Sequence, residues 1–239
     1  MTYHDHHGKR EFWLEYYEQD RLDFDWLLPF EPLSTLIFST LTHFDSYRTA
    51  KVLDVGCGSS SVLTSLNELG WADLTGIDYN AVVIEKMTKK TEAVKDQIRF
   101  IQMDSLAMDF PEETFSHILD KAHLDCILSG HQSIKKSKIY LKNVFKILQK
   151  GGFFICISTG SPDRRLSLLQ SIGWEIRHSK VCYLAKEDRE HEIDLMLYDE
   201  VPGDDKFRQE FQANLTKRQS TDRAADPCYH VYICQKASN

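Results

Sequence analysis

The chain has 239 residues, and 29 Lys and Arg against 36 Asp and Glu give it a formal net charge of −7. Hydrophobic residues make up 42% of it and aromatic residues 11%, which suits a buried core and excludes collagen-like, coiled-coil and globally disordered chains. No apolar run reaches the roughly 20 residues that span a bilayer, so we expect no membrane partner. The acidic balance argues against a nucleic-acid partner that is bound by bulk charge.

The six cysteines predict a reducing compartment, because most lie inside apolar runs and none forms a Cys-x-x-Cys pair. No set of Cys and His has metal-ligand spacing, so we expect no metal. The first ten residues lack an apolar secretory core. We therefore expect a cytoplasmic protein, or a mitochondrial one if a leader has been removed.

The N-terminal segment, residues 1–45, is aromatic-rich and predicted to be helical. Trp13, Tyr16 and Tyr17 fall near helical spacing, which predicts a short helix. A turn is expected over residues 24–32, and a second helix from about Leu33.

From residue 51 onward, short apolar runs alternate with amphipathic stretches. Serines before one stretch and Ser161-Pro162-Asp163 before another are typical helix starts, and Gly151-Gly152 is expected to end a helix. The predicted strands occupy 51–55, 74–77, 98–103, 115–119, 153–158, 174–184 and 229–235, and the predicted helices 62–69, 81–90, 137–149 and a stretch from 162.

This alternation predicts an α/β fold with a seven-stranded, mainly parallel, Rossmann-like sheet in a single domain, residues 1–239. No crossover helix separates the last two strands, so the last strand should be antiparallel. Between them lies an acidic insert, residues 186–227, with seven basic and twelve acidic residues and a net charge of −5. Leu195, Leu197 and Val201 indicate a short ordered piece within it.

The chemistry centres on the run VLDVGCGS at 52–59, where a strand leads into two glycines. In an open parallel sheet, ligands bind beyond the carboxyl ends of the strands, and glycines let them approach the backbone. A dinucleotide site is a poor match, because its third glycine is Ser61 here. Asp54 would also repel a pyrophosphate, whereas it suits a cationic group such as an ammonium.

Three more acids follow strands. Asp78 ends the second strand 20 residues past Gly58, the usual position of a carboxylate that binds ribose hydroxyls. Asp104 and Asp120 follow the next two strands. Aspartates often begin loops, but four in register with a Gly-x-Gly turn predict one binding crevice.

These motifs resemble the class I methyltransferases that use S-adenosylmethionine, over about residues 10–185 and the last strand. The motifs that carry the resemblance are VLDVGCGSS at 52–60, GIDYN at 76–80, FIQMD at 100–104 and the antiparallel tail. Within that class the chain is similar to protein-lysine methyltransferases that modify elongation factor 1-alpha or, in a mitochondrial member, citrate synthase. The narrower similarity lies in FWLEYYEQDRLDFDW at 12–26, MDSLAMDFPEETFSHILDKAHLD at 103–125 and SPDRRL at 161–166.

The resemblance implies S-adenosylmethionine as cofactor and gives roles to individual residues. The glycines would admit its methionine part, and Asp78 would hold the ribose. The N-terminal aromatic residues would form a lid, and ordinary packing of the N-terminal segment is the alternative interpretation of them. Aromatic faces attract a sulfonium cation. The implied cofactor-binding residues are Trp13, Tyr17, Trp26, Asp54, Gly56, Gly58, Asp78, Tyr79, Asp104, Ser105 and Lys121.

One departure from the lysine-methyltransferase pattern concerns catalysis. Ala122-His123 replaces the Gly-Thr of the signature, and His123 is either a general base or a change of shape at the pocket mouth. Asp120, ahead of Asp125, is the other catalytic candidate, as proton acceptor for the substrate amine. Its alternative role is a hydrogen bond to the ammonium of the cofactor.

We therefore expect a methyltransferase acting on a protein lysine, with elongation factor 1-alpha as a possible partner. A small-molecule N- or O-methyltransferase and a non-catalytic cofactor-binding module remain as alternatives. A nucleic-acid methyltransferase is disfavoured, because no Asn/Asp-Pro-Pro-aromatic motif follows the fourth strand. The acidic insert either docks a basic substrate or is a solvated loop.

Overall fold

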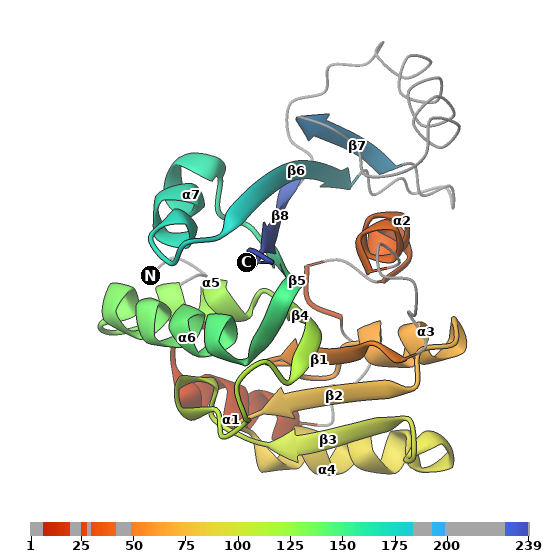
Figure 1. Ribbon diagram of the computed structural model, residues 1–239. Helices are drawn as coiled ribbons and strands as arrows, with labels where there is room; N and C mark the ends of the chain where they lie inside the picture. The colour runs from red at the N-terminus through yellow and green to blue at the C-terminus, as the bar shows by residue number, and fades with distance from the viewer. Residues whose placement is uncertain are drawn as a thin grey trace.

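The computed structural model describes residues 7–19, 25–27, 30–41, 49–183, 193–198 and 228–238. One sheet lies between helices on its two faces (Figure 1). Its order is β3-β2-β1-β4-β5-β8-β6-β7. The strands are β1 (Lys51–Val55), β2 (Asp73–Asp78), β3 (Ile98–Gln102), β4 (Phe115–Lys121), β5 (Leu148–Ser158), β6 (Glu175–Tyr183), β7 (Ile193–Tyr198) and β8 (Cys228–Gln235).

The first five strands of that order pair in parallel, and β8 inserts antiparallel between β5 and β6. The predicted mainly parallel sheet with an antiparallel last strand is therefore confirmed. β7 adds an eighth strand at the edge, antiparallel to β6, where we expected only a short ordered piece. The rest of the acidic insert lies outside the described residues.

The helices lie close to the predicted positions, with three differences. α5 was not predicted, α2 begins before Leu33, and α6 begins before residue 137. The helices are α1 (Arg10–Glu18), α2 (Phe30–Leu41), α3 (Val62–Glu68), α4 (Ala81–Lys90), α5 (His123–Leu128), α6 (Ser133–Ile147) and α7 (Pro162–Gln170), with short 3₁₀ turns η3 (Glu92–Val94) and η4 (Ser105–Ala107).

The prediction that Gly151-Gly152 ends a helix was wrong. β5 already begins at Leu148, directly after α6, and runs through both glycines. The C-terminal tail explains this, because Gly151 N donates to Lys236 O at 2.8 Å and Lys236 N donates to Gly152 O at 3.1 Å. A partner 85 residues away in sequence thus keeps the glycines in the sheet.

Side chains of β1 alternate between two cores, as a strand with both faces covered requires. Val52 packs with α2 and α3, whereas Leu53 and Val55 pack with α5, α6 and α7 on the other face. β1 lies between β2 and β4, where the order of strands reverses. A reversal of this kind opens a crevice at the carboxyl ends of the strands.

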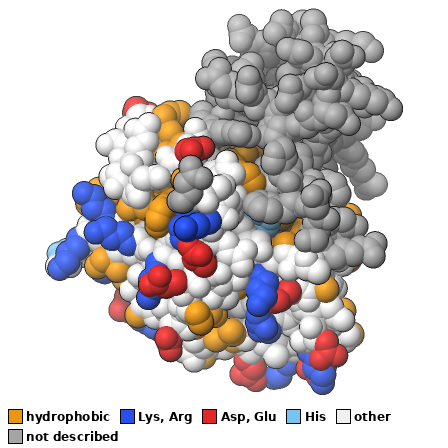
Figure 2. All heavy atoms as spheres, viewed as in Figure 1, with side chains coloured by type: hydrophobic (Ala, Val, Ile, Leu, Met, Phe, Trp, Pro, Cys, Tyr) orange, Lys and Arg blue, Asp and Glu red, His pale blue; other side chains and the backbone are white. Residues whose placement is uncertain are grey.

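Among the described residues, no helix is long and apolar enough to cross a membrane. On the face in Figure 2, acidic and basic side chains lie interspersed among hydrophobic ones.

Candidate functional site

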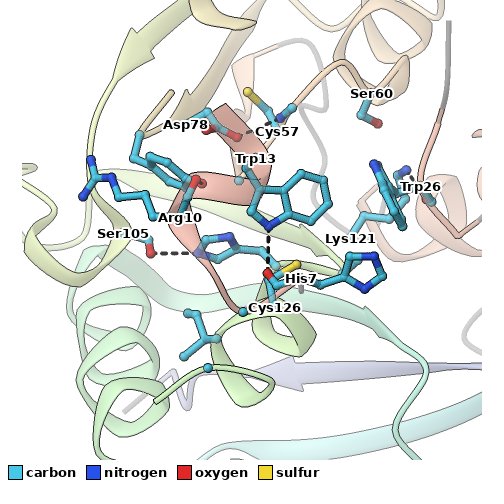
Figure 3. A pocket seen from close by; sticks show the side chains of 18 of the residues that line it. His7, Arg10, Trp13, Trp26, Cys57, Ser60, Asp78, Ser105, Lys121 and Cys126 are labelled. Carbon is cyan, nitrogen blue, oxygen red and sulfur yellow. Dashed lines mark hydrogen bonds between the residues drawn. The ribbon is translucent and has the colours of Figure 1, made fainter. Parts of the chain in front are cut away.

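A cavity of about 250 Å³ lies at the carboxyl ends of β1, β2 and β4, next to α1 (Figure 3). It brings together all the residues predicted to bind cofactor. Its lining includes Trp13, Tyr17, Trp26, Asp54, Gly56, Gly58, Asp78, Tyr79, Asp104, Ser105 and Lys121. The lining also contains His123 but not Asp120.

The turn after β1 exposes bare backbone to the cavity. Gly56 and Gly58 have φ of +65° and +49°, a region that side chains rarely adopt. A Cβ at Gly56 would lie 2.3 Å from His123 Nδ1, and one at Gly58 would lie 2.3 Å from Tyr17 Oη. Glycine is thus required twice over, by the backbone conformation and by the close approach of these two side chains.

Asp78 joins the end of β2 to this turn. Its Oδ2 accepts from Gly58 N at 3.2 Å and its Oδ1 accepts from Asn80 N at 2.9 Å. Burial raises the pKa of Asp78 to about 6, although these backbone bonds oppose the rise. Near pH 7 the carboxylate is therefore mostly charged and suited to accept hydrogen bonds from hydroxyl groups.

A second acid, Asp54, lies deeper in the cavity wall and is only 2% exposed. Burial raises the pKa of Asp54 to about 8. The ammonium of Lys121 lowers it, while Asp25, Asp120 and Asp78 raise it further. A cationic ligand would favour the charged form of this carboxyl, which fits the predicted contact with an ammonium.

The N-terminal aromatic residues gather against the cavity. The ring of Trp13 meets the ring of Trp26 edge-on at 5.0 Å between centroids and stacks on Tyr17 at 6.2 Å. Trp13 Nε1 donates to His7 O at 2.7 Å, a bond drawn in Figure 3. Asn80, the N-cap of α4, fixes α1 by donating from Nδ2 to Trp13 O at 3.0 Å. The aromatic segment thus lines the cavity, and its role as a lid stays a prediction.

The far end of the cavity is built around Tyr79. The guanidinium of Arg10 lies 4.4 Å from the centre of its ring, and Tyr79 Oη donates to Arg10 O at 3.2 Å. Arg10 also forms an exposed ion pair with Asp104 at 3.7 Å. Flat aromatic and guanidinium faces of this kind suit a purine ring.

His123, the predicted base, forms the wall between the β1 turn and η4. Its Nε2 lies 2.7 Å from Ser105 Oγ. Burial lowers the pKa of His123 to about 4, although Asp104 acts in the opposite direction. The ring is therefore neutral near pH 7. Ala122, which precedes it, has φ of +72° and turns the chain from β4 into α5.

The other proton-acceptor candidates are held in place by the fold. Asp120 is fully buried, and it accepts hydrogen bonds from Tyr140 Oη at 2.7 Å and from Leu124 N at 3.1 Å. Asp125 binds Arg165 and the backbone of Thr159 beyond β5. Both carboxylates thus fix the start of α5 and its neighbours.

The residues of the cavity wall that were missed include His7, Arg10 and Asp25. These three lie in the N-terminal segment, and Arg10 and Asp25 have partners far away in sequence. Arg10 meets Tyr79, and Asp25 meets Lys121, 96 residues away. The aromatic-acid-aromatic run around Asp25 was the available signal, but only its tryptophan was singled out.

The residues present fit S-adenosylmethionine. A ligand can reach the backbone of the glycine turn, a buried carboxylate stands at the end of β2, and aromatic rings line the opposite side. Among the described residues, no three His, Cys, Asp or Glu are grouped in a way that could hold a metal ion.

Comparison with known proteins agrees with this geometry. The profile of a family described as "Methyltransferase domain" matches residues 47–214. Among solved structures, the Burkholderia thailandensis 1,6-didemethyltoxoflavin-N1-methyltransferase, with its substrate and S-adenosylhomocysteine bound, superimposes with a TM-score of 0.61 at 16% identity. The match covers 95% of this chain and 87% of that one. At this identity it shows the fold alone.

Curated relatives are more similar in sequence. The mouse "eEF1A lysine and N-terminal methyltransferase" is 26% identical over 193 residues, covering 78% of this chain and 27% of that protein. This chain thus spans about a quarter of that relative. The bovine "EEF1A lysine methyltransferase 4" is 27% identical over 186 residues, covering 72% and 71%.

Proposed function

The chain belongs to the methyltransferase-domain family and uses S-adenosylmethionine, and on that premise we propose that it methylates a lysine side chain of a protein. The first candidate substrate is elongation factor 1-alpha. The observation that carries the proposal is the group of relatives named for lysine methylation of that factor, two of which match at 26% and 27% identity.

The cofactor supplies an activated methyl group, so the protein has to supply placement and electrostatics. In this proposal Asp78 holds the ribose hydroxyls and Asp54 faces the ammonium of the cofactor. Tyr79 and Arg10 flank the base, with Asp104 and Ser105 at its edge. The backbone of the glycine turn, residues 56–58, borders the methionine part.

A lysine amine must be neutral to accept a methyl group, although its reference pKa is about 10.4. Trp13, Tyr17 and Trp26 would exclude water from the approaching amine and so lower its pKa. This desolvation assigns the aromatic segment a part in catalysis beyond covering the cofactor.

The test incubates the purified protein and isotope-labelled S-adenosylmethionine with purified elongation factor 1-alpha, and in parallel with a cell lysate. Asp78→Ala serves as the control, because it removes the ribose acceptor. Label on the factor that is absent from the control, located on a lysine by mass spectrometry, would support the proposal.

Two other results would redirect it. Label on a lysine of a different protein would support lysine methylation and identify that protein as the substrate in place of elongation factor 1-alpha. No protein label, with S-adenosylhomocysteine binding intact in a titration, would favour a small-molecule substrate or a non-catalytic role.

A further inference from the structure

Asp25 contacts two walls of the cofactor cavity at once. One oxygen of its carboxylate pairs with Lys121 Nζ at the end of β4. The other accepts from Ser61 Oγ at 2.9 Å and from Ser61 N at 3.3 Å, in the turn after β1. The side chains of the ion pair are only 5% and 17% exposed, so this is a buried bridge between segments that are distant in sequence.

Lys121 also holds the neighbouring residue, because its Nζ donates to Trp26 O at 2.6 Å. The ring of Trp26 lies 5.0 Å from the rings of both Trp13 and His7. Figure 3 shows Trp26 and Lys121 on the same side of the cavity. Residues 25–27 therefore connect the aromatic cluster of α1 to β4 and to the glycine turn.

The contact with Ser61 has a local cost. Ser61 is the N-cap of α3, yet its side chain makes no capping bond to the helix and instead donates to Asp25. A serine side chain that caps a helix stabilises that helix, and α3 lacks this stabilisation here. The backbone beside Asp25 is strained as well, since Leu27, two residues further on, has φ of +66°. Such features persist only where the surrounding contacts hold them, and they are common at ligand sites.

We propose that Asp25 is a positioning residue that fastens the N-terminal aromatic segment across the cofactor cavity, by binding Lys121 on one wall and Ser61 on the other. The segment encloses the cofactor only while both contacts hold. Asp25 also shares the charge of Lys121 with the buried Asp54. The proposal rests on the proposed cofactor binding and not on the lysine acceptor. Its test is therefore independent of the identity of the substrate.

The test compares Asp25→Asn with the unaltered chain, using S-adenosylhomocysteine as the probe. We expect its Kd, measured by calorimetry, to rise about tenfold or more. In the loaded protein, amide hydrogen exchange over residues 10–18 and 25–27 should become at least several-fold faster. Ser61→Ala keeps the ion pair and the hydrogen bond from Ser61 N to Asp25, so it weakens the second contact without removing it and should raise Kd only two- to threefold.

The matched control is Asp73→Asn. It removes the carboxylate of another ion pair, Arg99 to Asp73 at 3.1 Å, which joins β3 to β2 outside the cavity lining. It should change neither Kd nor exchange in the N-terminal segment. Thermal melting establishes whether each variant is folded.

A pH series separates positioning from a general loss of structure. The groups facing Asp54 are Lys121, Asp25, Asp120 and Asp78. In Asp25→Asn, residue 25 no longer repels the charged form of Asp54 and no longer competes with it for the ammonium of Lys121. Both changes lower the pKa of Asp54. The pH midpoint for binding the cationic part of the probe should therefore move down in Asp25→Asn, whereas a general loss of structure would weaken binding equally at every pH.

A folded Asp25→Asn variant with a Kd within twofold of the original and unchanged exchange would overturn the proposal. If that variant does not fold, Ser61→Ala decides. In that case unchanged affinity and exchange in Ser61→Ala would overturn it as well.

Discussion

His123 Nε2 lies 2.7 Å from Ser105 Oγ, and this contact holds the imidazole directly over the backbone of Gly56. The ring fills space that the cofactor site would otherwise leave open. Because burial lowers the pKa of His123 to about 4, the ring is neutral near pH 7 and accepts a proton only weakly. Its position and its weak basicity both favour a structural wall over a general base.

The first prediction follows from that role. We expect His123→Ala to weaken S-adenosylhomocysteine binding several-fold and to lower kcat by less than about tenfold, whereas general bases contribute about 10²–10⁴. Calorimetry and turnover at saturating substrate measure the two effects. His131→Ala, at an exposed histidine, is the control. A kcat loss above a hundredfold with unchanged affinity would restore the base hypothesis.

The second prediction concerns the residue just before this histidine. Ala122 has φ of +72°, which costs a non-glycine residue about 1–2 kcal/mol. Ala122→Gly should therefore raise the free energy of unfolding by about 1 kcal/mol, visible as a Tm increase of about 2–4 °C. Ala81→Gly, at the first residue of α4, should give no increase. An equal change in Tm for the two variants would show that Ala122 is not strained.

The sequence predicted the sheet and most of the cofactor cavity, because these depend on local patterns. A short apolar run that ends in glycines located β1, and Asp78 was found by its spacing from Gly58. The bridge from Asp25 to Lys121 was not predicted, since a contact across 96 residues leaves no periodic signal. The burial of Asp120 could not be predicted from sequence either. This residue was a candidate proton acceptor because it follows the fourth strand, whereas the fold encloses its side chain completely.

The third prediction tests the role of Asp120. Burial raises the pKa of Asp120 to about 7, while the hydrogen bonds from Tyr140 and Leu124 oppose the rise. The unfolded chain, with an Asp pKa of about 3.9, loses this proton first. The free energy of unfolding should therefore fall as pH rises from about 4 to 7. Asn does not titrate, so Asp120→Asn lacks this contribution.

Urea unfolding at pH 5 and pH 8 measures the difference. The stability of the original chain relative to Asp120→Asn should be greater at pH 5 than at pH 8. Asp109→Asn, at an exposed acid, should show no such pH dependence. A difference that grows toward pH 8 would mean that the fold prefers the charged carboxylate, as a working base requires.

The last prediction separates backbone strain from the role of the glycine turn in binding. Gly58 and Gly173 both have positive φ, +49° and +98°. A Cβ at Gly58 would lie 2.3 Å from Tyr17 Oη, whereas a Cβ at Gly173 meets nothing within 4 Å. Either alanine should lower the free energy of unfolding by about 1–2 kcal/mol through strain.

Only Gly58→Ala should also displace Tyr17 from the cavity and lose the bond from Gly58 N to Asp78. We therefore expect its affinity for S-adenosylhomocysteine to fall by tenfold or more, with Gly173→Ala unchanged. Titration of both purified variants, each shown to be folded by its melting curve, gives the comparison. Equal affinities would mean that the cofactor does not lie against this turn, and the assignment of the methionine part to residues 56–58 would have to be abandoned.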